Sequence, residues 1–432
     1  MMNVRTRILV VILLLVGILP ASAQLEHSLS AYSPYTMFGL GDMSASGTAS
    51  TLAMGGIGLA LRTPNEFNYS NPAALSAIPQ NTAIFNIGAM SANYYQQTAS
   101  SSTAFNTANL NDLGFAFPIT RGLAMGFSLT QLSSVGYETA IIDDNPSVVE
   151  NIGRAIYSYY GEGGVSELNT SIGWKVVGGF SIGATMHYDF GTLDRHWDSA
   201  ITPLLGETSF SDLYSVERIQ VQKLRASLGM QYQFRVGYDD HIIIGATYDF
   251  KSEGVYDSKT LSYVSHYSGT DTVSYKVSDY PITFPEKFAA GISYNNTKLT
   301  VGFDYSRQDW TDAFETLSYI DLFLCEDYRI GASYTPDRRS VNNFFKRLTY
   351  KVGARYVTSY IGRDGYQPVD WTATCGVSMP LKAQNVSTLN LAIEYGERGG
   401  VESILNEQYF KVVVGLSLFG GDDMWFVKRK FN

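Results

Sequence analysis

The sequence predicts an all-β protein, a 14-stranded antiparallel transmembrane β-barrel with an N-terminal hatch (plug) inside the lumen. From position 81 onward, apolar and polar residues alternate with period 2 in segment after segment, as in strands whose two faces meet different environments. The links between these segments alternate between short and long, as in outer-membrane barrels. A glycine-rich stretch at 33–79 fits no strand and is the predicted hatch.

Each predicted strand has one apolar and one polar face. Phe180 and Ile182 alternate with Ser181 and Gly183, for example, as expected where one face meets lipid and the other the lumen. The fourteen segments are 82–96, 108–117, 123–130, 165–176, 180–191, 224–235, 242–251, 288–294, 299–306, 328–335, 350–357, 369–379, 389–395 and 410–418. An even number of strands, with both termini on one side, is typical of the bacterial outer membrane.

The links between segments predict which end of the barrel faces outward. Long links at 134–165, 191–215, 252–283 and 307–324 are expected to be outer loops, and the short links between them periplasmic turns. The link 336–347 is longer than this rule expects of a periplasmic turn.

The N-terminus has the features of a secretory signal peptide. Arg5 and Arg7 precede an apolar run at 8–19, and Ala21-Ser22-Ala23 suits a cleavage site. The apolar run is shorter than the roughly 20 residues that a membrane-spanning helix needs. We therefore expect a signal peptide at 1–23, a hatch at 24–80 and an outer-membrane barrel at 81–432, located in the bacterial cell outer membrane.

The charge balance and the reactive residues exclude several classes of function. Without Arg5 and Arg7, 29 basic residues face 40 acidic ones, a net charge of −11, which disfavours nucleic-acid binding. Cys325 and Cys375 lie far apart in separate predicted strands, so no disulfide is expected. The five histidines form no HExxH pattern, and neither CxxC nor G-x-S-x-G occurs. We expect no metal, no cofactor and no enzymatic activity.

Nearly every predicted strand carries a glycine on its polar face, near the expected periplasmic end. These are Gly114, Gly126, Gly173, Gly183, Gly229, Gly245, Gly291, Gly302, Gly331, Gly353, Gly376 and Gly415. A glycine inside a strand often marks the close approach of another backbone, although glycines also relieve curvature in a barrel wall. We favour a lumenal ring that receives the hatch, because a hatch candidate is present.

Several motifs resemble those of the FadL-type outer-membrane transporters, a family of channels for long-chain fatty acids and aromatic hydrocarbons. The hatch motif Asn71-Pro72-Ala73, together with Gly55 and Gly56, is similar to the N-terminal hatch of that family. The run 284–291, its continuation to Trp310, and the run 328–334 are also similar. The segments 33–35 and 38–39 and the C-terminal run 425–431 look like the branch found in Bacteroidetes-type bacteria.

The resemblance implies a channel for passive uptake of small hydrophobic molecules, gated by the hatch, with lateral exit through a wall gap beside the third strand. Gly136, which follows that strand, is the candidate for a bulge at the gap. The expected partners are outer-membrane lipid and a hydrophobic cargo. The alternative is a non-transporting partner or carrier barrel in a secretion or outer-membrane assembly complex, where outer loops such as 256–280 would dock other proteins.

Six apolar residues of the predicted hatch have two possible roles. Since the lumen is expected to be polar, they either contact a hydrophobic ligand or form the small core of the hatch itself. They are Met37, Phe38, Leu40, Met54, Ile57 and Leu59.

Overall fold

The computed structural model describes residues 31–45, 47–97, 102–151, 153–203, 211–266, 269–314, 320–340, 342–381, 386–399 and 405–420. The expected signal peptide, the first residues of the expected hatch and the C-terminal run 425–431 lie outside these ranges. No helix among the described residues has the length and apolar character to cross a membrane.

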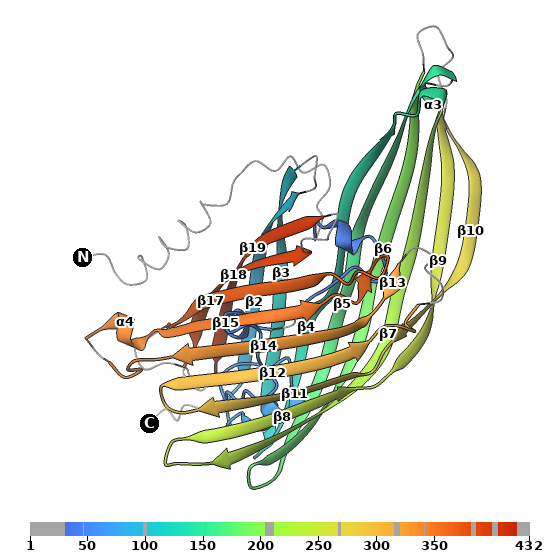
Figure 1. The fold of residues 1–432 in the computed structure, drawn as a ribbon. Helices are drawn as coiled ribbons and strands as arrows, with labels where there is room; N and C mark the ends of the chain where they lie inside the picture. Colours follow the sequence, from blue (N-terminus) through green and yellow to red (C-terminus); the bar gives the residue numbers. More distant parts are fainter. Residues whose placement is uncertain are drawn as a thin grey trace, which may run out of the picture.

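The wall is a closed barrel of fourteen antiparallel strands, as the sequence predicts (Figure 1). Its elements are β2 (Ile84–Gln97), β3 (Ser102–Thr120), β4 (Leu123–Asp143), β5 (Arg154–Val177), β6 (Phe180–Thr202), β7 (Asp212–Arg235), β8 (His241–Asp249), β9 (Ser252–His266), β10 (Gly269–Phe284), β11 (Lys287–Asn295), β12 (Leu299–Asp309), β14 (Leu324–Tyr334), β15 (Thr349–Thr358), β17 (Val369–Pro380), β18 (Thr388–Gly399) and β19 (Asn406–Phe419). β8 and β9 follow each other along β7 and form one wall strand. β10 and β11 form another, opposite β9 and β8. Pairing of β19 with β2 closes the barrel.

The smaller elements lie inside the barrel or in the links. The hatch contains η1 (Pro34–Thr36), β1 (Asp42–Met43), α2 (Ala49–Leu52) and η2 (Pro72–Ala77). The links contain α3 (Pro146–Asn151), α4 (Phe344–Arg347) and the paired strands β13 (Asp321–Leu322) and β16 (Ile361–Gly362). α4 occupies the link 336–347 that is unusually long for a periplasmic turn.

The outer surface of the wall carries an apolar belt. Successive strands expose large apolar side chains at alternate positions, among them Leu168, Met186, Leu228, Met230, Phe288, Ile330 and Val352. Their partners in the alternation face inward and are polar or glycine, for instance Ser227 and Gly229 on β7. This is the arrangement of a barrel whose outside meets lipid.

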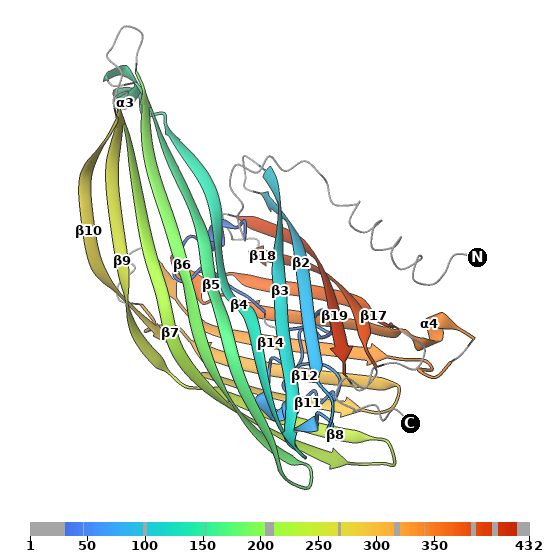
Figure 2. The same ribbon diagram turned by 180° about the vertical axis from the view of Figure 1, so that it is seen from behind.

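The prediction of long outer loops is wrong for three of the four links. The segments 134–165, 191–215 and 252–283 are mostly strand, and they extend β4 to β7, β9 and β10 into a tall wall on one side of the barrel (Figure 2). β5 alone has 24 residues, whereas about 9–11 cross a bilayer. We call the part beyond the apolar belt the extended wall.

The extended wall reverses the hydrophobic pattern of the membrane-spanning part. On β7, Leu224 and Leu228 face outward and are exposed, whereas Val221 and Ile219 face inward and are fully buried. The apolar residues thus change faces between positions 221 and 224. Apolar and polar residues still alternate beyond this point, but the apolar ones now face inward. Because the pattern is interrupted where the faces change, the sequence predicts loops in these segments instead of continuous strands.

The hatch fills the lumen next to the glycine ring. A Cβ on Gly353 would overlap Gly55, one on Gly245 would overlap Leu59, and one on Gly183 would lie 2.6 Å from the Ala73 nitrogen. Each of the twelve ring glycines has a hatch atom among its nearest neighbours in this sense. The glycines therefore provide the room in which the hatch backbone lies against the wall.

Candidate functional site

A cavity of about 350 Å³ lies between the hatch and the wall. Its apolar lining includes Leu59, Leu132 and Phe284, and its cationic lining includes Arg225 and Arg398. The lining thus combines apolar surface with charged groups. Both arginines form ion pairs, Arg225 with wall carboxylates and Arg398 with carboxylates of the wall and the hatch.

An aromatic cluster borders the cavity on the side of the extended wall. Trp310, which is 1% exposed, packs with Phe314 and Tyr360 above the hatch residue Leu40. The Tyr360 hydroxyl donates to the Gly41 carbonyl at 2.7 Å and accepts from the Leu40 N–H at 3.3 Å. We call Trp310, Phe314 and Tyr360 the aromatic roof. The sequence does not predict it, because these residues come from a strand end and two separate links.

A buried ion cluster occupies the lumen face of β5 to β7. Arg225 contacts Asp189 and Glu167, each at 2.5 Å. His187 shares its ring nitrogens with Asn169 at 2.6 Å and Ser227 at 2.8 Å. On the lumen face, Asp189 is fully buried, whereas His187 is partly buried and lines the cavity.

The hatch motif is a hydrogen-bonding centre. The Asn71 side chain caps η2 by accepting from the Ala73 N–H at 3.1 Å. It also donates to the carbonyls of Leu59 in the hatch and Met230 in the wall, at 3.0 Å each. Pro72, at the first helical position, needs no N–H partner there. The motif therefore ties the helix, a hatch loop and the wall together at a fully buried position.

Two wall side chains hold the hatch loop that precedes this motif. The Asp304 carboxylate accepts from the N–H groups of Gly58 at 2.6 Å and Leu59 at 2.9 Å. Arg329 donates to the Gly56 carbonyl at 2.9 Å. Elsewhere in the hatch, Tyr69 donates to Asp112 at 2.8 Å. Burial, together with that carboxylate, raises the pKa of Tyr69 well above its usual value, so the phenol stays protonated.

The six apolar hatch residues lie in different surroundings. Met54 and Ile57 pack with Leu61 into a small core of the hatch itself. Leu40 and Met37 belong to the aromatic roof. Phe38 is partly buried, and Leu59 is the one of the six that lines the cavity.

The wall is split beside its third strand. β3 and β4 pair from Thr120–Leu123 to Asp112–Thr130 and then separate. Beyond that point β3 continues alongside β2, and β4 continues alongside β5. We call this opening, between residues 102–111 and 131–143, the seam. The register of β4 is irregular between Gln131 and Ser133, whereas Gly136 pairs regularly with Glu162.

Gly136 has a different environment from the expected bulge. The hatch backbone at Ala31 lies directly on it, so that any Cβ there would overlap the Ala31 carbonyl. Ser33 donates its N–H to the Gly136 carbonyl at 2.7 Å. The irregularity that begins the seam is at Leu132, and Gly136 provides space for the hatch.

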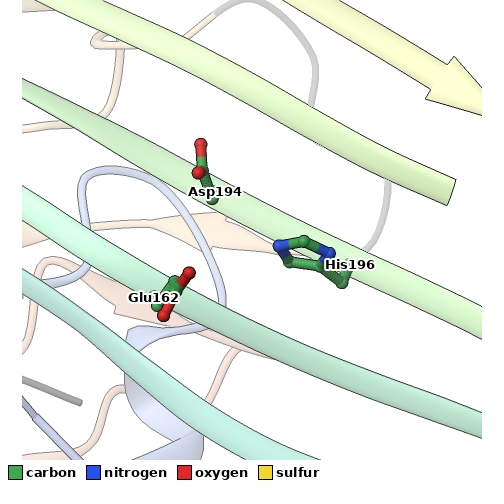
Figure 3. Close-up of side chains that lie close together, drawn as sticks. All are labelled: Glu162, Asp194 and His196. Carbon is green, nitrogen blue, oxygen red and sulfur yellow. The ribbon is translucent and has the colours of Figure 1, made fainter. Parts of the chain in front are cut away.

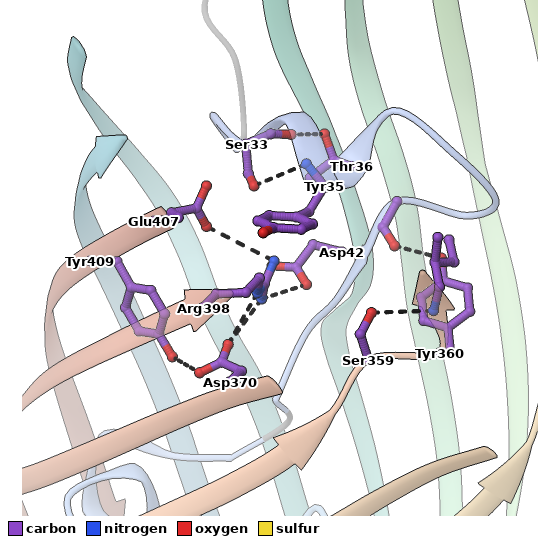
Figure 4. Close-up of polar contacts among 12 residues, drawn as sticks. Ser33, Tyr35, Thr36, Asp42, Ser359, Tyr360, Asp370, Arg398, Glu407 and Tyr409 are labelled. Atoms are coloured by element: carbon purple, nitrogen blue, oxygen red, sulfur yellow. Dashed lines mark hydrogen bonds and ion pairs between the residues drawn. The ribbon is translucent and has the colours of Figure 1, made fainter. Parts of the chain in front are cut away.

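A second ion network lies beside the seam (Figure 4). Arg398 donates to both carboxylate oxygens of Asp42, on the hatch, at 2.9 and 3.0 Å, and to Asp370, on the wall, at 3.1 Å. Glu407 lies 4.0 Å from the same guanidinium. Asp370 in turn accepts from the Tyr409 hydroxyl at 2.6 Å. One wall cation is thus shared between the hatch and two wall carboxylates.

Glu162, Asp194 and His196 converge on the outer face of the extended wall (Figure 3). Their ligand atoms lie within 4.8 Å of one another. The Asp194 carboxylate, however, already binds the Arg218 guanidinium, with contacts from 2.6 to 3.1 Å. A metal ion would have to compete with this cation for its carboxylate ligand.

The closed fourteen-stranded wall, the lumenal hatch and the seam beside the third strand define a FadL-type barrel. Solved structures with this fold include the Ralstonia pickettii toluene transporter TbuX, with 16% identity, a TM-score of 0.56 and coverage of 86% of this chain and 98% of that one. A Pseudomonas aeruginosa FadL homologue has 13% identity, a TM-score of 0.60 and coverage of 88% and 99%. The Pseudomonas putida toluene transporter TodX has 17% identity, a TM-score of 0.55 and coverage of 88% and 99%.

The comparison with protein families matches residues 4–432 to BamG. The chain therefore belongs to the BamG family. A comparison with curated protein sequences finds no match. The predicted FadL-type fold is confirmed, and TbuX and TodX, which share it, are toluene transporters.

Proposed function

We propose that this protein is a bacterial outer-membrane channel for passive passage of small hydrophobic molecules, and that they cross the wall at the seam. The observation that supports this proposal is that the cavity reaches the seam. Its lining includes Leu110 on β3, Leu132 on β4 and Met43 on the hatch. At the seam, the cavity is therefore bounded by a hatch residue and by residues of the two strands that separate.

The position of the seam suits a hydrophobic cargo. It starts at the pair Asp112–Thr130, near the outward-facing Leu110 and Leu168, which are 49% and 44% exposed. These belong to the apolar belt, so the seam opens toward lipid. The aromatic roof borders the cavity on the side of the extended wall. Release sideways would keep an apolar molecule out of water, where its transfer is unfavourable.

Uptake into vesicles tests the proposal. The purified barrel is reconstituted in liposomes, and entry of toluene and of a fluorescent fatty acid is compared with entry into liposomes without protein. We expect faster entry of at least one probe, with no requirement for an energy source. Equal rates for both probes would contradict the channel function.

The extended wall favours a second candidate, a partner barrel in a secretion or outer-membrane assembly complex. From Ser274 to Pro281, β10 pairs with β9 on one edge, and along its other edge the described residues form no register pairs. A strand at the edge of a sheet can accept a strand from another protein. Purification in mild detergent distinguishes the candidates, because a stoichiometric protein partner supports the second and a single chain with bound lipid supports the first.

A further inference from the structure

We propose that a group of cations around α4 binds the headgroups of anionic phospholipid in the membrane leaflet that surrounds this end of the barrel. We call these residues the basic patch: Lys298, Arg338, Arg339, Lys346 and Arg347. The proposal concerns the outside of the wall and does not depend on passage of a cargo through the lumen. It is carried by the position of α4, by exposed aromatic side chains beside it and by an excess of positive charge.

α4 is attached to the lipid-facing side of the wall. It lies at the turn end of β14 and β15, away from the extended wall (Figure 1). Short turns join most strands at this end, as on the periplasmic side of outer-membrane barrels. Tyr350 on β15 shares its face with Val352 of the apolar belt. Because the Tyr350 hydroxyl donates to the Phe345 carbonyl at 3.1 Å, the helix is held beside an outward-facing side chain.

Exposed aromatic side chains mark the membrane boundary at this position. Tyr350 is the register partner of Tyr334 on β14, and both are exposed on the outward face. Tyr294, near the end of β11, is also exposed. Tyrosines in such a row typically lie at the headgroup level of a bilayer. Phe345 is 68% exposed beside this row, so we expect its ring to enter the interface.

The link that contains α4 is basic, although the chain as a whole is acidic. Residues 336–347 carry four basic side chains and the single acid Asp337, whereas the complete chain has a net charge of −9. Arg338, Arg339 and Lys346 are exposed. In the part of the chain that the structure describes, no residue of the basic patch forms an ion pair. Clustered cations at a bilayer surface attract anionic headgroups.

Backbone hydrogen bonds bring the cations of the basic patch together. The Asp337 N–H donates to the Lys346 carbonyl at 2.8 Å, which joins the two halves of the link. The Thr335 N–H donates to the Lys298 carbonyl at 2.8 Å, so the neighbouring turn adds its own cation. Arginine can bind a phosphate with two N–H groups, and lysine adds a compact charge. The basic patch therefore suits a phosphate group.

Anionic phospholipid fits this surface better than an acidic protein segment does. The Arg347 guanidinium lies 5.5 Å from the centroid of the Phe344 ring, which packs edge-on against Phe345. Cations and exposed aromatic carbon thus alternate within one turn of the chain. A phospholipid offers a phosphate and apolar carbon at adjoining depths, and this combination binds basic, aromatic segments. An acidic peptide would satisfy the cations but leave the Phe345 ring in water.

Lipid titration tests the selectivity for charge. The full chain in mild detergent is titrated with phosphatidylglycerol or with phosphatidylcholine of the same acyl chains, and bound lipid is counted by native mass spectrometry. Each cation near an anionic surface contributes roughly a fivefold gain in affinity, so we expect phosphatidylglycerol to bind at least tenfold more tightly. The preference should disappear when the four cations of the link are replaced together: Arg338→Gln, Arg339→Gln, Lys346→Gln and Arg347→Gln.

The matched control makes the same change in charge on exposed residues distant from α4. It combines Arg154→Gln, Lys251→Gln, Lys276→Gln and Arg363→Gln, and it should keep the preference for phosphatidylglycerol. Equal affinity of the unmodified chain for the two lipids would overturn the proposal. An equal loss of preference in the control would also overturn it, because the net charge and not the basic patch would then decide binding.

A fluorophore at position 345 tests the membrane placement with all cations present. In a background with Cys325→Ser and Cys375→Ser, Phe345→Cys carries an environment-sensitive dye, and the protein is reconstituted in bilayers. We expect blue-shifted emission that spin-labelled phosphatidylglycerol quenches more strongly than spin-labelled phosphatidylcholine. The control is the dye on Asp364→Cys, at an exposed link residue, which should emit as in water.

Emission as in water from position 345 would overturn the placement of α4 at the bilayer. A blue shift that neither lipid quenches would mean that protein covers the ring, which would also overturn the proposal. Neither test measures passage of a cargo. The lipid site and the proposed channel function can therefore fail independently of each other.

Discussion

The Asp304 carboxylate accepts a hydrogen bond from the backbone N–H of Gly58 at 2.6 Å. A wall side chain thereby fixes a hatch loop 246 positions earlier in the sequence. The same carboxylate accepts from Leu59, and Asp304 is 5% exposed. The hatch is thus held by charged hydrogen bonds as well as by packing, and this leads to the first prediction.

Asp304→Ala should loosen the hatch while leaving the barrel closed. It leaves two buried N–H groups without an acceptor, and hydrogen bonds to a charged group contribute about 1.5–3 kcal/mol each. We expect protease cleavage within residues 54–61 that is absent from the unmodified protein. Asp304→Asn keeps one acceptor oxygen and should show an intermediate effect. Equal resistance of all three proteins would contradict this anchoring role.

Gly353→Val should displace the hatch from the glycine ring. Any Cβ at this position overlaps Gly55 and the Met54 backbone. Hydrogen exchange of the 53–57 amides should increase, because their packing against β15 is lost. The neighbouring Ala354→Val adds the same side chain on the exposed, outward face, and it should leave exchange unchanged. Comparable exchange in the two variants would argue against close hatch packing at the ring.

Gly136→Ala should displace the first described residues of the hatch, which begin at Ala31. The added methyl group would occupy the position of the Ala31 carbonyl, so residues near Ser33 must move. We expect limited proteolysis to cut within residues 31–45, with the melting temperature of the barrel little changed. Ala140→Val, on an exposed part of the same strand, is the control. Protection of residues 31–45 in the Gly136→Ala variant would show that this position tolerates a side chain.

Arg225→Met should destabilise the barrel. It leaves Glu167 and Asp189 as buried carboxylates without their cation, and removing one partner of a buried ion pair typically costs about 3–5 kcal/mol. The midpoint of urea unfolding in detergent micelles should fall accordingly. Arg225→Lys keeps the charge but loses the bidentate geometry, so we expect a smaller decrease. An unchanged midpoint for Arg225→Met would mean that water reaches the cluster.

Where the apolar face points to one side only, the sequence was sufficient to predict the structure. Strands such as β6 up to Phe190 put apolar residues on the lipid side at every second position, and this fixes strand identity, strand number and the direction of the lumen. The glycines on the polar face predicted that another part of the chain lies against the wall, because a glycine at a regular, inward-facing strand position often marks the close approach of another backbone.

The extended wall could not be predicted in the same way. Beyond Phe190 the apolar residues face inward, toward a cluster around Leu193, so the phase of the alternation reverses within one strand. A local pattern does not say which solvent each face meets. The segment therefore has the appearance of a loop until its neighbours are known.

The sequence by itself determined the barrel, its strand number and the presence of a hatch, because a bilayer imposes one repeating pattern on every strand that crosses it. Only the tertiary structure decided which hatch residue meets which wall residue. The pairing of Asp42 with Arg398 joins positions 356 residues apart, and the seam exists because β3 and β4 diverge in space. Contacts of this kind depend on how the chain closes on itself, and no local periodicity records them.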